Sequence, residues 1–290
     1  MKWEGREQSK NVEDRRGMSR GAGIALGGGG LLILLIAVLF GFDPQQVMQL
    51  IGQNPGGAAQ QQQRDPNWKP SPEEEKLAEF TRTIFRDTEV VWDDLFSRMG
   101  KRYDKPVLVL FSGNVTSACG FADAAVGPFY CPGDSKVYID LAFYSDMQKK
   151  LNSPGEFARA YVVAHEVGHH VQRLLGYSAR VDQVRALGNK VEANNASVRL
   201  ELQADFLAGV WAHHAQKKFN FLEPGDVESA LNAAFEIGDD RLQKKARGYV
   251  VPDAFTHGTS KQRQRWFMHG LKTGDVKQAA LLFEMPYDEL

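Results

Sequence analysis

The stretch AHEVGHH, residues 164–170, constrains this chain more than any other, because its chemistry requires a helix. His165 and His169 are four residues apart. In a helix they stack on one face, about one turn apart, where both imidazoles can bind one ion. Glu166 is rotated by about 100° from His165, so it borders that ion without binding it. Two neutral ligands and an adjacent carboxylate are what H-E-x-x-H offers to a catalytic metal.

Flanking residues predict the extent of this helix. Ser153 and Pro154 are expected at its start, and Gly176 is a natural stop. Gly168 inside the helix costs roughly 1 kcal/mol relative to alanine, so we expect a close-packed neighbour at that position. His170 points away from the other two histidines, and we expect it to be a hydrogen-bonded packing residue.

A third metal ligand has to come from elsewhere in the chain. The metzincin extension needs Gly at position 172 and His at 175, but the sequence has Gln172 and Leu175. The segment RLELQADFLAGVWAHH supplies Glu201 and Asp205, again four residues apart. Such a pair usually marks a solvated face, but here the neighbours are apolar, and buried carboxylates need partners. Glu201 would complete a His-His-Glu set that leaves a position for water, and Asp205 would accept the spare N–H of a ligand histidine.

The N-terminal region reads as a membrane anchor. Residues 21–42 carry no charge and are long enough to cross roughly 30 Å of hydrocarbon. Six Lys or Arg lie in residues 1–20 and none in the twenty residues after the apolar run. The positive-inside rule therefore makes 1–20 a cytoplasmic tail and places the rest outside. A cleaved signal peptide is the alternative, but the long N-terminal region with four acidic residues and the absence of a small-x-small site favour an uncleaved anchor.

Composition divides the remainder into a tether and a domain. Residues 43–70 are rich in Gln, Pro and Gly, with little to bury, and predict a flexible linker. Residues 71–290 are expected to form one domain, opened by a helix that is capped at Ser71 and runs to about Met99. A net charge of -1 and the absence of a basic stripe argue against a nucleic-acid partner.

Two short apolar runs, residues 105–113 and 135–144, predict strands, so the fold class is α+β, mainly helical with a small sheet. The two cysteines, Cys119 and Cys131, lie between these strands. Outside the cytoplasm such a pair most simply forms a disulfide. A zinc-binding pair and a reduced pair are the alternatives.

Taken together, the motifs resemble a known family. H-E-x-x-H followed by E-x-x-x-D is similar to the ligand set of the gluzincin peptidases. The anchor, the glutamine-rich tether and the segments SACG…GPFYCPGDSKVYIDLAFY, HEVGHHVQ, ELQADFLAGVWAHH and FTHGTSKQRQRWF resemble the bacterial putative neutral zinc metallopeptidase family over nearly the whole chain. The resemblance implies a zincin-like fold, one Zn²⁺ per chain and hydrolysis of a peptide or protein substrate.

The resemblance also implies roles for individual residues. These are zinc ligands at His165, His169 and Glu201, a general base at Glu166, and an orienting carboxylate at Asp205. FTHGTSKQR resembles the Thr-His-Pro…Arg segment of membrane-bound zinc peptidases, with Gly258 in place of proline. His257 is then the candidate donor to the oxyanion, with Arg263 in support, and a helix-capping histidine is the alternative. In zincins the strand before the active-site helix binds substrate, which here implies residues 137–141.

Three histidines stay outside this set. His213 and His214 follow the ligand helix and are expected to be exposed ends, and His269 has no assigned role. The sequence favours a single-pass zinc endopeptidase of the bacterial inner membrane, with its domain on the periplasmic side. Stem peptides of peptidoglycan are a further substrate class. The alternative is a catalytically silent, zinc-stabilised adaptor, against which the water-accepting ligand set argues.

Overall fold

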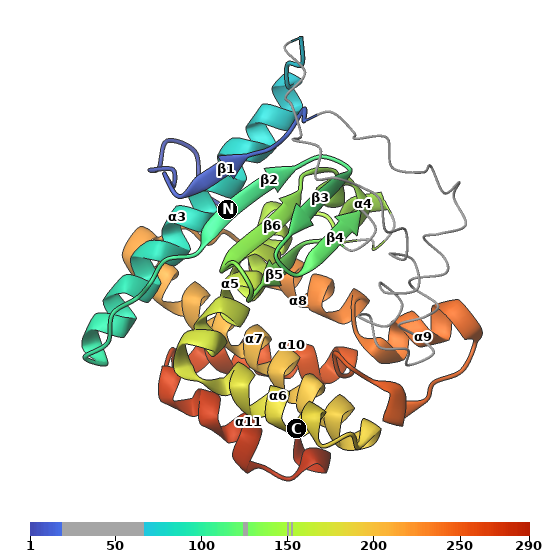
Figure 1. Ribbon diagram of the computed structural model, residues 1–290. Helices are drawn as coiled ribbons and strands as arrows, with labels where there is room; N and C mark the ends of the chain where they lie inside the picture. The colour runs from blue at the N-terminus through green and yellow to red at the C-terminus, as the bar shows by residue number, and fades with distance from the viewer. Residues whose placement is uncertain (19–66, 124–126, 150, 152) are drawn as a thin grey trace.

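The computed structural model describes residues 1–18, 67–123, 127–149, 151 and 153–290 (Figure 1). The expected membrane helix, residues 21–42, lies outside these ranges, as does most of the linker. Among the helices of the described ranges, none is both long and apolar enough to cross a membrane.

A four-stranded sheet forms one side of the domain, in the order β1-β2-β6-β5. Its strands are β1 Val12–Asp14, β2 Val107–Phe111, β6 Lys136–Asp140 and β5 Phe129–Cys131. The first three run parallel, and β5 pairs antiparallel with β6. The two strands expected from apolar runs are therefore confirmed as β2 and β6. The polar strand β1 was not predicted, because VED carries no apolar alternation.

A hairpin lies beside this sheet. It consists of β3 Asn114–Ser117 and β4 Gly120–Asp123. Cys119, at its turn, forms a disulfide with Cys131 of β5, which confirms the expected pairing. The disulfide therefore ties the hairpin to the last strand of the sheet.

Four long helices form the body of the domain: α3 Pro72–Arg98, α5 Glu156–Leu175, α7 Lys190–Phe219 and α10 Ser260–Thr273. Ser71 caps α3 by accepting the Glu74 N–H, as expected. Helix α5 ends at Gly176 in the left-handed region, also as expected, but no side chain caps its start, and Ser153 bonds the Leu151 carbonyl instead. The shorter helices are α4 Ala142–Lys149, α6 Tyr177–Ala186, α8 Asp226–Glu236, α9 Asp239–Arg247 and α11 Leu281–Glu284. In the part of the chain that the structure describes, 3-10 turns lie at Pro252–Ala254, Val276–Ala280 and Tyr287–Glu289.

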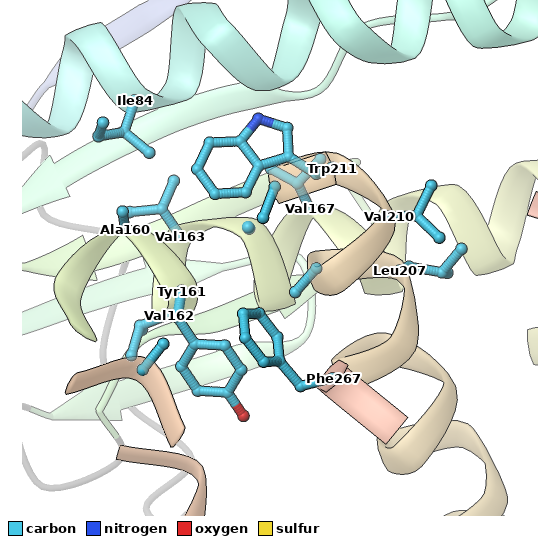
Figure 2. Packing of buried hydrophobic residues seen from close by; sticks show 14 of the residues in the cluster. Ile84, Ala160, Tyr161, Val162, Val163, Val167, Leu207, Val210, Trp211 and Phe267 are labelled. Atoms are coloured by element: carbon cyan, nitrogen blue, oxygen red, sulfur yellow. The ribbon is translucent and has the colours of Figure 1, made fainter. Parts of the chain in front are cut away.

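Helix α5 is central to this arrangement. It contacts α3 and β5 on the side of the sheet, and α7 and α8 on the other side (Figure 1). Its buried face includes Phe157, which packs on Trp211 of α7 and Phe267 of α10. Tyr161, one turn further along, meets Phe267 edge to face (Figure 2). The result is a mainly helical α+β fold with a small mixed sheet.

Residues 1–18 pack onto the domain, which differs from the separate tail that the sequence suggested. Val12–Asp14 pair with Leu108–Leu110 of β2 in parallel register. Trp3 is 6% exposed and belongs to the main hydrophobic core. The segment therefore contributes both a strand and a core residue to the fold.

Helices α7 and α10 cross at two glycines. A Cβ atom added to Gly270 would lie 2.0 Å from the Phe206 carbonyl oxygen, and one added to Gly209 would lie 2.1 Å from the Phe267 carbonyl oxygen. Both obstacles are backbone atoms, which cannot rotate away. This crossing therefore depends on the absence of side chains.

We predict that Gly270→Ala destabilises the domain although alanine is the better helix former. The added methyl group forces the two helices apart and should cost about 3 kcal/mol of unfolding free energy. Urea denaturation followed by circular dichroism measures this. Lys272→Ala, on the same helix, is the control and should change stability by less than about 0.5 kcal/mol. Equal midpoints for the two variants would contradict the prediction.

Candidate metal centre

The candidate site lies where α5 and α7 approach most closely. A Cβ atom on Gly168 would lie 3.1 Å from the Ala204 carbonyl oxygen and 3.3 Å from the Ala204 Cα. The expectation of a close-packed neighbour at this glycine is confirmed. Because the backbones nearly touch here, side chains one turn away on each helix can reach a common point.

Three side chains converge there. The Nε2 atom of His165 lies 3.2 Å from Glu201 Oε2, and the Nε2 atom of His169 lies 3.5 Å from Glu201 Oε1. The potential ligand atoms of all three residues lie within 4.8 Å of one another. The structure thus brings the three predicted zinc ligands together.

Asp205 fixes the orientation of His165 from behind. Its Oδ1 accepts from His165 Nδ1 at 2.9 Å and from the Tyr161 hydroxyl at 2.5 Å. Arg263 donates to both Asp205 oxygens, at 2.8 and 2.9 Å. Asp205 is fully buried and Arg263 is 2% exposed, so each charge has the other as its partner. Arg263 therefore acts on the ligand histidine through Asp205, whereas the sequence suggested that it supports the oxyanion.

Gln172 fixes the orientation of His169, as Asp205 does that of His165. This role was not predicted from the sequence. The Oε1 atom of Gln172 accepts from His169 Nδ1 at 2.9 Å, and its Nε2 donates to the Leu200 carbonyl at 2.5 Å. Gln172 is fully buried. It lies three residues after His169, so a helical wheel places the two side by side, and this spacing was the available signal.

Glu166 lies beside the three ligands and is 8% exposed. Burial raises the pKa of Glu166 to about 7, while the positive charge of a protonated His165 and the Tyr130 backbone N–H oppose the shift. Tyr130 belongs to β5. A carboxylate in this position can exchange a proton near neutral pH.

Charge at the site favours a cation. Burial by itself would lower the pKa of His165, but Asp205 and Glu201 outweigh burial and raise that pKa to about 10. Burial would raise the pKa of Glu201, but the neighbouring histidines hold it well below its usual range. A proton is therefore held between imidazole and carboxylate, and a metal would compete for this position.

The donor set fits zinc. Both Nδ1 atoms are occupied by Asp205 and Gln172, so both Nε2 atoms are left to face Glu201. Two imidazole nitrogens and one carboxylate, with carboxylate and amide partners behind them, are typical of catalytic zinc sites with an open position. A structural zinc site would need a fourth protein ligand.

His257 reaches the neighbourhood of the site on a loop. Asp239 Oδ2 accepts the backbone N–H groups of Thr256, His257 and Gly258, at 2.7, 2.6 and 3.1 Å. Gly258 has a φ of +87°, and a Cβ atom there would lie 3.1 Å from Leu202 Cδ2, one residue beyond Glu201.

The imidazole of His257 is held by the same carboxylate. Its Nδ1 lies 3.1 Å from Asp239 Oδ1. Burial opposes protonation, but Asp239 and the charge of Glu201 outweigh it and raise the pKa of His257. The helix-capping alternative is wrong, because Thr259 and Gln262 form the capping box of α10.

The remaining histidines have structural contacts. His170 bonds the Tyr130 hydroxyl and the Asp104 carbonyl, and burial lowers its pKa to about 4, which confirms a packing role. His213 and His214 are partly buried, and they bond the carbonyls of Leu271 and Gly274. The expectation of exposed ends is therefore wrong for them. His269 bonds Gln278.

We predict that Gln172→Ala binds zinc about 10- to 100-fold more weakly, because His169 loses the acceptor that fixes its ring. Competition against a fluorescent chelator measures the affinity. Gln203→Ala is the matched control, since Gln203 is equally buried and bonds a backbone carbonyl, that of Ala279, away from the ligands. Unchanged affinity in Gln172→Ala would remove the orienting role.

Comparison with known proteins agrees with this site. The family described as "Putative neutral zinc metallopeptidase" matches residues 1–281. The uncharacterized protein YpfJ of Escherichia coli (strain K12) is 47% identical over 285 residues, which cover 96% of this chain and 97% of that protein. The uncharacterized protein Rv2575 of Mycobacterium tuberculosis (strain H37Rv) is 46% identical over 183 residues, which cover 60% and 61%. No solved structure matches the chain. The chain belongs to the putative neutral zinc metallopeptidase family.

Proposed function

We propose that this protein is a zinc-dependent metallopeptidase, an endopeptidase with a zincin-like active site. The observation that carries the proposal is the convergence of His165, His169 and Glu201 with Glu166 buried beside them. Three protein ligands leave one position of a tetrahedral zinc open, whereas a structural site is closed by a fourth protein ligand. A carboxylate whose pKa lies near neutrality, next to an open coordination position, is what hydrolysis requires.

Glu166 is the general base of the proposed reaction. When bound by the three ligands, zinc would lower the pKa of a water molecule and polarise the scissile carbonyl. Glu166 accepts the proton of the attacking water and later delivers it to the leaving amine. Its burial excludes bulk solvent, and the Tyr130 N–H holds its carboxylate in place.

His257 is the proposed donor to the oxyanion, the negatively charged oxygen that forms when the carbonyl carbon is attacked. Asp239 raises the pKa of His257 and so favours the protonated ring, which donates more strongly. The three backbone bonds to Asp239 hold the loop before substrate arrives, which suits a pre-organised donor.

The substrate is proposed to lie along β5. The strand suggested by the resemblance, residues 137–141, is interior, because β6 pairs with β2 on one side and β5 on the other. Within the described residues β5 ends the four-stranded sheet. The Tyr130 N–H of this strand bonds Glu166. An extended peptide added to this edge would pass the general base.

The domain is proposed to function outside the cytoplasm. The disulfide between Cys119 and Cys131 supports this, since such bonds persist in oxidising compartments. Attachment to the bacterial inner membrane through residues 21–42 stays a prediction from the sequence.

We predict that Glu166→Gln abolishes peptide cleavage while one zinc per chain is retained. The glutamine amide cannot accept the proton, and loss of a general base costs about 10²- to 10⁴-fold in rate. Cleavage of a peptide library, with metal analysis of the same preparations, tests this. Glu192→Gln, exposed on α7, is the control and should keep full activity. If the unaltered protein binds zinc but cleaves no peptide, the alternative of a catalytically silent, zinc-stabilised adaptor is favoured.

We predict that His257→Ala lowers kcat by about 10²- to 10³-fold with little change in KM, because the donor acts on charge that develops in the transition state. Its melting temperature should stay close to that of the unaltered protein, since Thr259 caps α10. His269→Ala serves as the control histidine. A fully active His257→Ala enzyme would end the oxyanion assignment.

A further inference from the structure

Residues 1–18, here called the N-terminal segment, are bound to the domain by more than one kind of contact. Besides the strand pairing of β1, Trp3 meets Phe80 of α3 edge to face at 5.4 Å. The Trp3 indole N–H donates to Glu156 Oε1 at 2.9 Å. Trp3 is therefore fixed at both its apolar face and its polar edge.

The domain presents two buried carboxylates to this segment. Asp87 and Glu89 of α3 are 3% and 1% exposed. Arg6 forms a salt bridge with Asp87 and lies over the rings of Phe219 and Phe221. Burial raises the pKa of Asp87 to about 7 even though Arg6 opposes the shift. Without Arg6, this carboxylate would lose the cation that bonds it.

Glu89 depends on the same segment. Its Oε1 accepts from the Ser9 hydroxyl at 2.8 Å and from Asn11 Nδ2 at 2.7 Å, while Arg86 of α3 approaches the other oxygen at 3.1 Å. Two of these three partners come from the N-terminal segment. A domain that folded without the segment would therefore leave buried acceptors with fewer donors.

Other charged residues of the segment also form ion pairs with the domain. Arg16 is 2% exposed and lies 2.6 Å from Asp14 and 2.9 Å from Glu75 of α3. Lys136 of β6 lies 2.5 Å from Glu13. The positive-inside rule reads Arg6 and Arg16 as charges that hold a flank in the cytoplasm. In the structure they neutralise carboxylates of the domain.

We propose that the domain face formed by β2 and α3 is a docking surface for the N-terminal segment, and that residues 1–18 lie on the same side of the membrane as the metal centre. A segment that supplies an edge strand, a core tryptophan and the partners of two buried carboxylates cannot be separated from the domain by a bilayer. The inference replaces the cytoplasmic assignment of residues 1–20. It also replaces the expectation that residues 21–42 cross the membrane once, because a single crossing would put residues 1–18 and the domain on opposite sides. It does not depend on the proposed peptidase activity.

Cysteine accessibility in intact cells tests the placement. Full-length Lys10→Cys and Lys218→Cys each place one free thiol on an exposed residue, and the native cysteines are paired. A membrane-impermeant maleimide, with permeabilised cells as the reference, should label both variants or neither. Labelling of both also agrees with a domain outside the cytoplasm, and protection of both contradicts that part of the proposed function alone. Protection of Lys10→Cys with labelling of Lys218→Cys would overturn the inference.

Thermal unfolding of the full chain tests the docking itself. Arg6→Gln leaves Asp87 buried without its cation and should lower the melting temperature by about 5 to 15 °C. Adding Asp87→Asn removes the buried carboxyl group that has lost its partner, so the double variant should melt higher than the sum of the single losses predicts. Lys10→Gln, exposed in the same segment, is the control. A melting temperature of Arg6→Gln equal to that of Lys10→Gln would overturn the docking.

Discussion

The contact between Gly168 of α5 and the backbone of Ala204 is the constraint on which the metal centre depends. It brings the two helices close enough for His165 and His169 to share Glu201. A larger residue at 168 would separate the donors before any ligand was lost. The tight crossing of α7 and α10 at Gly209 and Gly270 serves a second purpose, because α10 carries Arg263 to the far side of the same site.

This arrangement buries charged side chains, which is unfavourable for a charge without a partner. Each buried charge here is paired with an opposite charge or a hydrogen-bond donor. Asp205 has His165, Tyr161 and Arg263 around one carboxylate. A histidine held by a buried, paired carboxylate keeps one tautomer and one ring orientation. The orienting partner of His169 is a neutral glutamine, so the two ligand histidines differ in basicity: the pKa of His165 is raised to about 10, and burial lowers that of His169.

Paired polar groups also connect the sheet and the N-terminal segment to the helices that carry the candidate site. β5 holds Glu166 through the Tyr130 N–H, and the disulfide of Cys131 ties β5 to the hairpin. At the other edge of the sheet, Arg16, two residues beyond β1, forms an ion pair with Glu75 of α3, which packs on α5. Polar contacts between residues distant in sequence thus hold in place the sheet and α3, against which α5 packs.

The sequence by itself identified the three side chains of the candidate metal centre, the carboxylate beside them, the cysteine pair and the two central strands, because helical spacing, burial of carboxylates and β-branched runs are local signals. Only the tertiary structure decided that Asp239 holds the His257 loop and that, among the described strands, β5 instead of β6 ends the sheet. It also moved Arg263 behind His165 and placed the N-terminal segment on the domain. The physical reason is common to all of these. A buried hydrogen bond or ion pair joins residues far apart in the sequence, as Arg6 and Asp87 are at 81 positions, and no periodicity along the chain records which partner fills it.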